Sequence, residues 1–308
     1  MLRRSALLAI VTASAVAIAG CGLGAGTGAS NVTLTISRGF GNVQVAHLTT
    51  GHVHGSETVM RMLERHFRIT TRYGGGFVQS IDGLSGAPAH VDWFYYVNGV
   101  EAPAGAATTA IHAGDRIWWD LHDWSASQDT PAVVGSFPEP FVHGVGGRRL
   151  PTTLGCGAGV GKACQRVTNE MSALGVPIAS QLIGTGSGTD SLAVEVGTWR
   201  ELRGEVVADL IDGGPGSSGV YAKFTGPGGA ALQLLDPRGS VVMTLGKGAG
   251  LIAATAQGSS QPTWLITGTD AAGVSAAAAA FTPAALRDHF ALAVAGQRQL
   301  PVPLQGTM

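Results

Sequence analysis

Asp92-Trp-Phe-Tyr-Tyr-Val-Asn-Gly99 is the stretch that decides the fold of the first part of this 308-residue chain. Aromatic and β-branched side chains fill Trp93–Val97, and such residues favour a strand that is half-buried in a sheet. Asn98-Gly99 follows directly, and both central residues of a two-residue hairpin turn need a positive φ, which Asn and Gly tolerate best. The stretch therefore predicts a strand that passes through a tight turn into an antiparallel neighbour.

The rings of this strand would lie on two opposite faces of a sheet, because successive side chains in a strand alternate. Trp93 and Tyr95 share one face, and Phe94 and Tyr96 share the other. One set can fill the core of the domain. The other set lines the outer face, where exposed rings mark a surface for a ligand or a partner, unless a tether or a second domain covers them. The sequence leaves these two alternatives open.

The flanking residues predict a small, mainly antiparallel sheet with one helix. Val32–Ser37 alternates apolar and polar side chains, as a half-buried strand does. After Ser56, apolar side chains recur at helical spacing as far as Phe67, and Ser56 is a natural N-cap residue. Phe77–Ile81 and Ile117–Leu121 provide two further strands.

The chain as a whole is predicted to form two α+β domains. Most of the rings lie before residue 145, whereas residues 150–308 are rich in Ala, Gly, Leu and Val. The Gly- and Pro-rich stretch Pro138–Thr153 indicates the boundary, with a ring-rich domain at 31–140 and a second α+β domain at 150–308. The second domain is predicted to hold helices at 161–174, 199–211, 271–281 and 283–294, and strands at 192–196, 220–224, 231–235, 241–245 and 264–267.

The N-terminus has the features of a secretory signal. Two arginines precede the apolar run Leu7–Ala19, which is shorter than the ~20 residues that a membrane-spanning helix needs. Ile18-Ala-Gly-Cys21 ends the run and resembles the lipobox of bacterial lipoproteins, in which the Cys thiol is lipidated. We therefore expect a signal peptide at 1–20 and a flexible tether at 21–30. An ordinary signal peptide that happens to end near a Cys is the alternative.

These features predict a lipoprotein held in the cell membrane by acyl chains such as palmitate on Cys21, with its folded mass outside the cytoplasm. Cys156 and Cys164 are the other two cysteines, and such a compartment favours a disulfide between them. A loop of seven intervening residues would contribute roughly 2–3 kcal/mol in the chain-entropy model. A two-cysteine metal site is the alternative, but no His lies between or next to them.

Charge and motifs exclude several classes of function. Only 13% of residues are charged and the net charge is −1, which argues against nucleic acid and against a polyanionic substrate. Gly157–Lys162 falls short of a phosphate-binding loop, because Cys156 holds the leading position and Ala163 stands where a hydroxyl must bind Mg²⁺. The Gly-rich runs contain no Gly-x-Ser-x-Gly motif. We therefore predict no enzymatic activity and no resident cofactor.

The nine histidines do not predict a metal site. His52 and His54 would face one side of a strand, and a third ligand would have to come from His47 or His90 across the fold. Solvated loop imidazoles are the simpler interpretation. The Asp-Leu-His-Asp cluster at 120–123 could form an acid–base pair, although a single Asp–His contact is more often structural.

The first domain resembles a known bacterial family, the domain-of-unknown-function family 4430, which is similar to the C-terminal β-domain of transcobalamin and intrinsic factor. Three motifs carry the resemblance: Gly74-Gly-Gly-Phe-Val-Gln-Ser-Ile-Asp-Gly83, Asp92-Trp-Phe-Tyr-Tyr-Val-Asn-Gly99 and Ala113-Gly-Asp-Arg-Ile-Trp-Trp-Asp120. It covers about residues 31–125 and implies a small β-rich domain with one helix. Trp93 and Tyr95 match the family's strand, and Asn98-Gly99 matches its turn.

The resemblance also suggests a ligand. In the eukaryotic relatives the β-domain closes over cobalamin beside an α-helical domain. This chain contains no repeated helix pairs of the length that such a helical partner needs. The resemblance therefore implies a cobalamin-like ligand but provides only one of the two domains that enclose it.

We expect a cell-surface binding lipoprotein whose ring-rich sheet face takes an amphipathic ligand, with cobalamin or a related cofactor as the first candidate, in support of uptake by a membrane importer. Rings supply stacking and apolar contact, and polar side chains orient the ligand. The residues predicted to contact the ligand are Trp93, Tyr95, Tyr96, Asn98, Trp118 and Trp119. The alternative is an interaction module that docks another envelope protein through the same rings and binds no small molecule.

Overall fold

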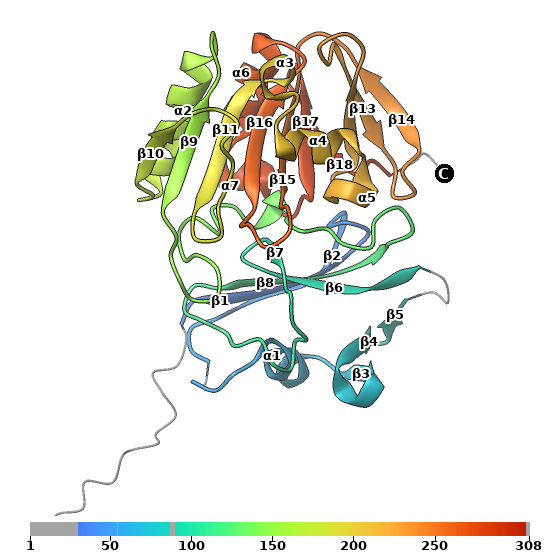
Figure 1. Cartoon of the computed structure of the whole chain (residues 1–308). Coiled ribbons are helices and arrows are strands. Elements are labelled where there is room, and N and C mark those ends of the chain that lie inside the picture. The colour runs from blue at the N-terminus through green and yellow to red at the C-terminus, as the bar shows by residue number, and fades with distance from the viewer. Residues whose placement is uncertain (1–29, 54, 87–89, 306–308) are drawn as a thin grey trace, which may run out of the picture.

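The computed structural model describes residues 30–53, 55–86 and 90–305, and it contains two packed α+β units (Figure 1). The first unit runs from Val32 to Asp123, and the second runs from Val134 to Val302. The α+β class predicted from the sequence is confirmed. The predicted signal peptide and the lipidation site Cys21 lie outside the described residues.

No helix among the described residues is both long enough and apolar enough to cross a membrane.

A five-stranded sheet with the strand order β2-β1-β8-β6-β7 is the centre of the first unit. Its strands are β1 (Val32–Arg38), β2 (Val43–Thr50), β6 (Val91–Val97), β7 (Val100–Glu101) and β8 (Arg116–Asp123). The β1–β8 pair is parallel and the other neighbours are antiparallel, so the sheet is mainly antiparallel, as predicted. Asn98 and Gly99 form the β6–β7 turn with φ values of 56° and 76°, which confirms the predicted hairpin.

One face of this sheet packs against a helix and a small sheet (Figure 1). The covering elements are α1 (Val59–His66), β3 (Ile69–Arg72), a short 3₁₀ turn η1 (Tyr73–Gly75), β4 (Phe77–Ile81) and β5 (Leu84–Ser85). The Thr58 hydroxyl accepts a hydrogen bond from Arg61 N and caps α1, so the N-cap lies two residues after the predicted Ser56. α1 buries Val59 and Leu63 against the sheet.

The second unit is built on a seven-stranded sheet with the order β10-β9-β11-β16-β15-β17-β18. Its strands are β9 (Thr152–Cys156), β10 (Ile178–Gln181), β11 (Leu192–Thr198), β15 (Ala249–Thr255), β16 (Thr263–Gly268), β17 (Ala291–Ala295) and β18 (Arg298–Val302). The pairs from β10 to β16 are parallel, and those from β16 to β18 are antiparallel.

Helices cover one face of the large sheet, and a mixed layer covers the other. α2 (Gly161–Ala173) and α6 (Ala271–Ala280) pack on the first face. The mixed layer consists of α3 (Trp199–Leu202), α4 (Val206–Asp212), α5 (Pro215–Ser218), β12 (Ala222–Thr225), β13 (Ala231–Leu235) and β14 (Val241–Leu245). A disulfide joins Cys156 at the end of β9 to Cys164 in α2, which confirms the predicted pair.

Two helices predicted for the second unit differ from the structure. The helix predicted over 199–211 is interrupted after Leu202, and α4 begins only at Val206. The helix predicted over 283–294 is wrong beyond α7 (Pro283–Leu286), because Ala291–Ala295 forms β17. β17 pairs with β15 on one side and β18 on the other, so sheet hydrogen bonds override the weak local preference of an Ala- and Leu-rich segment.

The connection between the units is part of the second core rather than a linker. A 3₁₀ turn, η2 (Val134–Ser136), leads into Phe137 and Phe141, which are fully buried. Both rings contact Trp264, with centroid separations of 5.8 Å and 5.2 Å. The core of the second unit therefore includes residues at the start of the stretch predicted as the boundary, 138–153.

Candidate functional site

The six side chains predicted to contact a ligand are largely buried. Tyr96 and Asn98 are fully enclosed, and Trp93, Trp118 and Trp119 are at most 4% exposed. Tyr95 is half-buried. The open ring-rich face that the ligand hypothesis required is therefore not present in the described structure. The other alternative, in which the second unit covers the rings, is what the structure contains.

The covered face, which we call the joint face, is the side of the first sheet that faces the second unit. Phe290, which directly precedes β17, packs among its rings. The Phe290 centroid lies 5.5 Å from Tyr96, 5.3 Å from Trp118 and 5.0 Å from Phe40. Burial of large rings contributes strongly to apolar packing, so most rings of the joint face pack against the second unit and are not open to solvent.

Polar groups on the joint face are hydrogen-bonded to one another. Asp120 is fully buried and accepts hydrogen bonds from Phe40 N (2.8 Å), Gly41 N (2.9 Å) and His122 Nδ1 (2.9 Å). The Ser37 hydroxyl donates to Asp120 and accepts from Trp118 Nε1 at 2.7 Å. The Asp–His contact in the 120–123 cluster is therefore structural, since both groups are sealed from solvent.

Asn98 also has a structural role at this position. Its Nδ2 donates to Asp115 Oδ1 (2.9 Å) and to the Gly144 carbonyl (2.8 Å), and its Oδ1 accepts from Arg116 N (2.8 Å). These bonds use both amide donors and the amide oxygen. Asn98 therefore fastens the β6–β7 turn to the chain that enters the second unit, and leaves no free atom for a ligand.

The opposite face of the sheet, which faces α1, contains a hollow of about 190 Å³. We call this face the hollow face and the cavity the ring-lined hollow. Three of the predicted ligand residues line it, namely Trp93, Tyr95 and Trp119, together with Phe77 from β4. Gly76, Val78, Phe94, Glu101, Ala102, Gly105 and Ala106 complete the lining. The Tyr95 and Trp119 rings are stacked, with centroids 4.8 Å apart.

Trp119, which lines this hollow, carries an unpaired hydrogen-bond donor. Its Nε1 is buried and has no partner among the described residues. The Trp93 indole differs, because its Nε1 donates to the Leu84 carbonyl at 3.3 Å. An unpaired buried donor costs about 1–3 kcal/mol.

Two titratable groups border the same hollow. The Tyr95 hydroxyl contacts the Ala104 carbonyl and Thr109 Oγ1, and burial raises the pKa of Tyr95 so that it stays neutral. Burial raises the pKa of Glu101 from 4.5 to about 7, although a hydrogen bond from Thr130 N opposes the shift. Phe77 and Glu101 were not predicted, even though Phe77 lies in the first family-like motif and Glu101 follows the hairpin turn.

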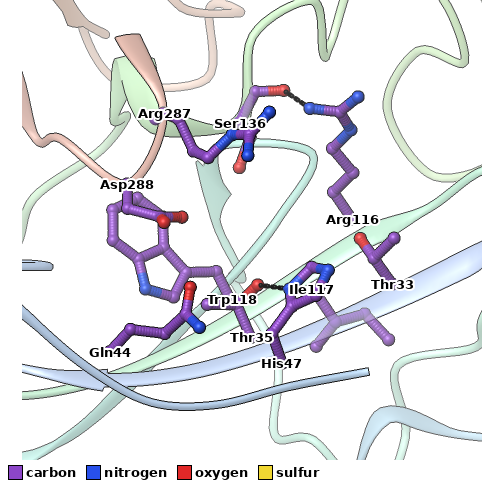
Figure 2. Close-up of a pocket in the computed structure, with 11 residues that line it drawn as sticks. Thr33, Thr35, Gln44, His47, Arg116, Ile117, Trp118, Ser136, Arg287 and Asp288 are labelled. Carbon is purple, nitrogen blue, oxygen red and sulfur yellow. Dashed lines mark hydrogen bonds between the residues drawn. The ribbon is translucent and has the colours of Figure 1, made fainter. Parts of the chain in front are cut away.

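A second hollow lies at the other side of the sheet, where the two units meet. It measures about 240 Å³ and has a mainly polar and charged lining drawn from β1, β2, β8, η2 and the end of α7 (Figure 2). Trp118 is the one predicted ligand residue in its lining. We call it the inter-unit cleft.

Among the described residues, the histidines considered as metal ligands do not form a metal-binding group. His47 Nδ1 is hydrogen-bonded to Thr35 Oγ1 at 2.9 Å, and the His90 ring packs edge-on against Trp124. His54 lies outside the described residues. Within the described ranges, no group of three or more His, Cys, Asp and Glu side chains is arranged to hold a metal ion.

The fold and the hollow define a two-unit α+β protein in which the first sheet unit contains a small, partly open hollow lined by aromatic side chains. Residues 56–123 match a family model described as "Domain of unknown function (DUF4430)". The match spans α1 to β8 and contains every residue that lines the ring-lined hollow. The family predicted for the first unit is thereby supported over these residues, whereas no comparison supports the similarity to transcobalamin.

Other comparisons add little. No curated protein matches the chain. One solved structure, a candidate metal-binding protein from Ruminococcus gnavus ATCC 29149, is 15% identical, with the match covering 30% of this chain and 97% of that one. The TM-score of 0.25 is too low to support a conclusion about this chain.

Proposed function

We propose that this protein is a lipid-anchored binding protein on the outer face of the cell membrane, and that the ring-lined hollow takes the apolar end of a small amphipathic ligand. The observation that carries the proposal is the unpartnered Nε1 donor of Trp119, a residue that lines a hollow with aromatic side chains in its wall. The lipobox-like sequence before Cys21 and the Cys156–Cys164 disulfide favour an extracytoplasmic location.

The chemistry of the hollow defines the kind of ligand. The rings of Phe77, Trp93 and Tyr95 favour an apolar or aromatic group, since they offer large contact areas at low conformational cost. The Trp119 N–H favours a carbonyl or another acceptor on that group. Buried polar donors give such sites most of their selectivity, because a ligand without the acceptor leaves the donor unpaired.

The size of the hollow limits the ligand. A cavity of about 190 Å³ is close to the ~150 Å³ apolar cavity that binds benzene in another protein. It holds one ring or a short aliphatic group, so only a ring-sized part of a cobalamin-like ligand would enter. We therefore propose a small amphipathic molecule as the ligand, with delivery to a membrane importer as its purpose.

Two ligands of nearly the same shape test the proposal. Acetophenone carries a carbonyl and ethylbenzene does not, and we expect acetophenone to bind about fivefold to tenfold more tightly, the effect of one hydrogen bond. Binding would be measured by isothermal titration calorimetry. Trp119→Phe keeps a ring but removes the N–H, and it should abolish the difference between the two ligands.

Trp264 offers a matched control. Its Nε1 is also buried without a partner, but its ring lies in the core of the second unit. Trp264→Phe should leave the affinity for both ligands unchanged. Equal binding of the two ligands to the native protein, or the same loss in both variants, would contradict the proposed role of Trp119.

The alternative, an interaction module for another envelope protein, is favoured by a different observation. β2 is an edge strand of the first sheet, and its Val43 and Val45 are 45% and 42% exposed. An open edge with apolar side chains can pair with an extended segment of another protein. The partner surface proposed here is therefore the β2 edge and not the buried rings.

Substitutions on β2 separate this alternative from ligand binding. The double variant Val43→Lys/Val45→Lys places charges on the exposed edge and should abolish capture of an envelope protein from solubilised membranes. The same variant should bind acetophenone normally, because neither valine lines the ring-lined hollow. Unchanged capture by the double variant would exclude the β2 edge as the docking surface.

A further inference from the structure

The inter-unit cleft brings together charged side chains from both units (Figure 2). β8 supplies Arg116, and the residues that follow α7 supply Arg287 and Asp288. Figure 2 places Asp288 beside the Trp118 indole and Arg116 on the opposite side of the cleft. Ligand sites in proteins often lie at such junctions between units.

The charges in the cleft are not neutralised by ion pairing with one another. The half-buried Asp288 carboxylate forms no hydrogen bond or salt bridge with a described residue. Arg287 is exposed, and its guanidinium also forms no hydrogen bond with the described residues. Burial raises the pKa of Asp288, and the cations around it lower that pKa. Both signs of charge are therefore available to a ligand.

Other groups in the cleft are fixed in place. Arg116 Nη1 donates to the Ser136 carbonyl (3.3 Å) and the Phe137 carbonyl (2.9 Å), which holds the guanidinium at the wall. His47 Nδ1 is bound to Thr35 Oγ1, as drawn in Figure 2. Asp288 itself has a φ of 59°, a conformation that non-Gly residues adopt at a cost and that is frequent at ligand sites.

We propose that the inter-unit cleft binds a free α-amino acid as a zwitterion. The ligand's ammonium group would lie against Asp288, and its carboxylate would lie between Arg116 and Arg287. An Arg guanidinium suits a carboxylate because its planar donors match the two oxygens. The apolar side chain of the ligand would lie along the Trp118 indole, and a cleft of about 240 Å³ accommodates a molecule of this size.

Opposite charges on one small molecule match the cleft better than a single charge. A simple anion would be attracted by the arginines but repelled by Asp288. A simple cation would be attracted by Asp288 but repelled by the arginines. Uncompensated charges are the main way in which a site rejects a wrong ligand. The cleft therefore selects for molecules that carry an ammonium and a carboxylate close together.

This site is independent of the proposed function, because the inter-unit cleft and the ring-lined hollow share no lining residue. The two can be tested on the same protein. Acetophenone reports on the hollow and amino acids report on the cleft, so failure of one proposal leaves the other measurable.

Leucine and its two single-charge analogues provide the probes. Isopentylamine lacks the carboxylate of L-leucine, and 4-methylpentanoate lacks its ammonium group. By calorimetry on the whole exported chain, L-leucine should bind at least about tenfold more tightly than either analogue, because each analogue loses a charge-assisted contact. The absence of binding heat with L-leucine at ~10 mM, a concentration that detects even weak binding, would overturn the proposal. Equal affinity for the three probes would also overturn it.

Two variants assign the binding to the cleft. Asp288→Asn removes the charge and keeps a residue that tolerates positive φ, and Arg287→Gln changes an exposed side chain, so both should fold. Each should weaken L-leucine binding about tenfold or more. Asp82→Asn is the control, because Asp82 also has a positive φ (48°) and lies in the exposed β4–β5 turn. Leucine affinity that is unchanged in Asp288→Asn and Arg287→Gln would overturn the proposal.

Discussion

Trp118 and Trp119 are neighbours in β8, yet they lie on opposite faces of the same sheet in opposite environments. Trp118 on the joint face donates its Nε1 to Ser37 Oγ, and Phe290 from the second unit packs against its ring. Trp119 on the hollow face lines a cavity, and its Nε1 has no partner in the part of the chain that the structure describes. Both side chains are at most 3% exposed.

The comparison shows that two rings can be almost equally buried and still differ in their hydrogen bonding. The two side chains differ in whether the indole Nε1 has a hydrogen-bond partner. On the joint face the Trp118 indole joins a hydrogen-bonded group that includes Ser37 and Asp120, as expected where two parts of a chain pack permanently. On the hollow face the Trp119 N–H has no partner among the described residues, and the ring to which it belongs lines the ring-lined hollow.

The largest expected effect tests whether the joint face is a permanent core. Phe290→Ala removes a ring that contacts Tyr96, Trp118 and Phe40, and we expect a loss of about 3–5 kcal/mol in the free energy of unfolding. Urea denaturation measures it. Tyr73→Ala, at a site that is 86% exposed, should change stability by under about 0.5 kcal/mol. A similar small loss for Phe290→Ala would mean that the units separate easily.

The next prediction has a smaller expected effect and concerns the protonation of Glu101, which lines the ring-lined hollow. Burial raises the pKa of Glu101 from 4.5 to about 7, so the folded protein keeps a proton that the unfolded chain has lost between those pH values. Its contribution to stability is therefore full below pH 4.5, and stability falls as the pH rises through about 7. The free energy of unfolding should therefore fall by roughly 3 kcal/mol between these two limits.

Glu101→Gln should remove this pH dependence while keeping a side chain of the same shape. The free energy of unfolding of both proteins would be compared by urea denaturation at pH 5 and pH 8. The native protein should lose more stability than the variant between the two values. Identical profiles would show that the Glu101 carboxyl titrates as it does in the unfolded chain.

The local features of the first unit could be predicted from the sequence. The ring-rich strand and its Asn98-Gly99 turn depend on residues within a few positions of one another, because alternation and positive φ are local requirements. The Cys156–Cys164 pair was also predictable, since few cysteines are available to pair. By contrast, β17 was predicted as helix because its identity depends on β15 and β18, which lie far from it in the sequence or offer no local signal.

The site was harder to predict than the fold. The sequence indicated that one set of rings would need an explanation, but it could not tell that Phe290 covers Tyr96 and Trp118, because that contact joins distant parts of the chain. The sequence also led to the prediction that Asn98 contacts a ligand. In the structure its side-chain amide is hydrogen-bonded to Asp115, Gly144 and Arg116. An unpaired donor such as Trp119 Nε1 is a property of three-dimensional packing and has no sequence signature.

The smallest expected effect is also the sharpest test of the comparison between the faces. Trp118→Phe and Trp119→Phe make the same chemical change at adjacent positions of β8, so the loss of ring volume is similar in both. Trp118→Phe also removes the hydrogen bond to Ser37, whereas Trp119→Phe removes a donor that has no partner. We expect Trp118→Phe to lower the free energy of unfolding by about 1 kcal/mol more than Trp119→Phe does. If Trp119→Phe costs as much or more, its N–H is already satisfied in the ligand-free protein, and the hollow face then has no advantage over the joint face for recognition.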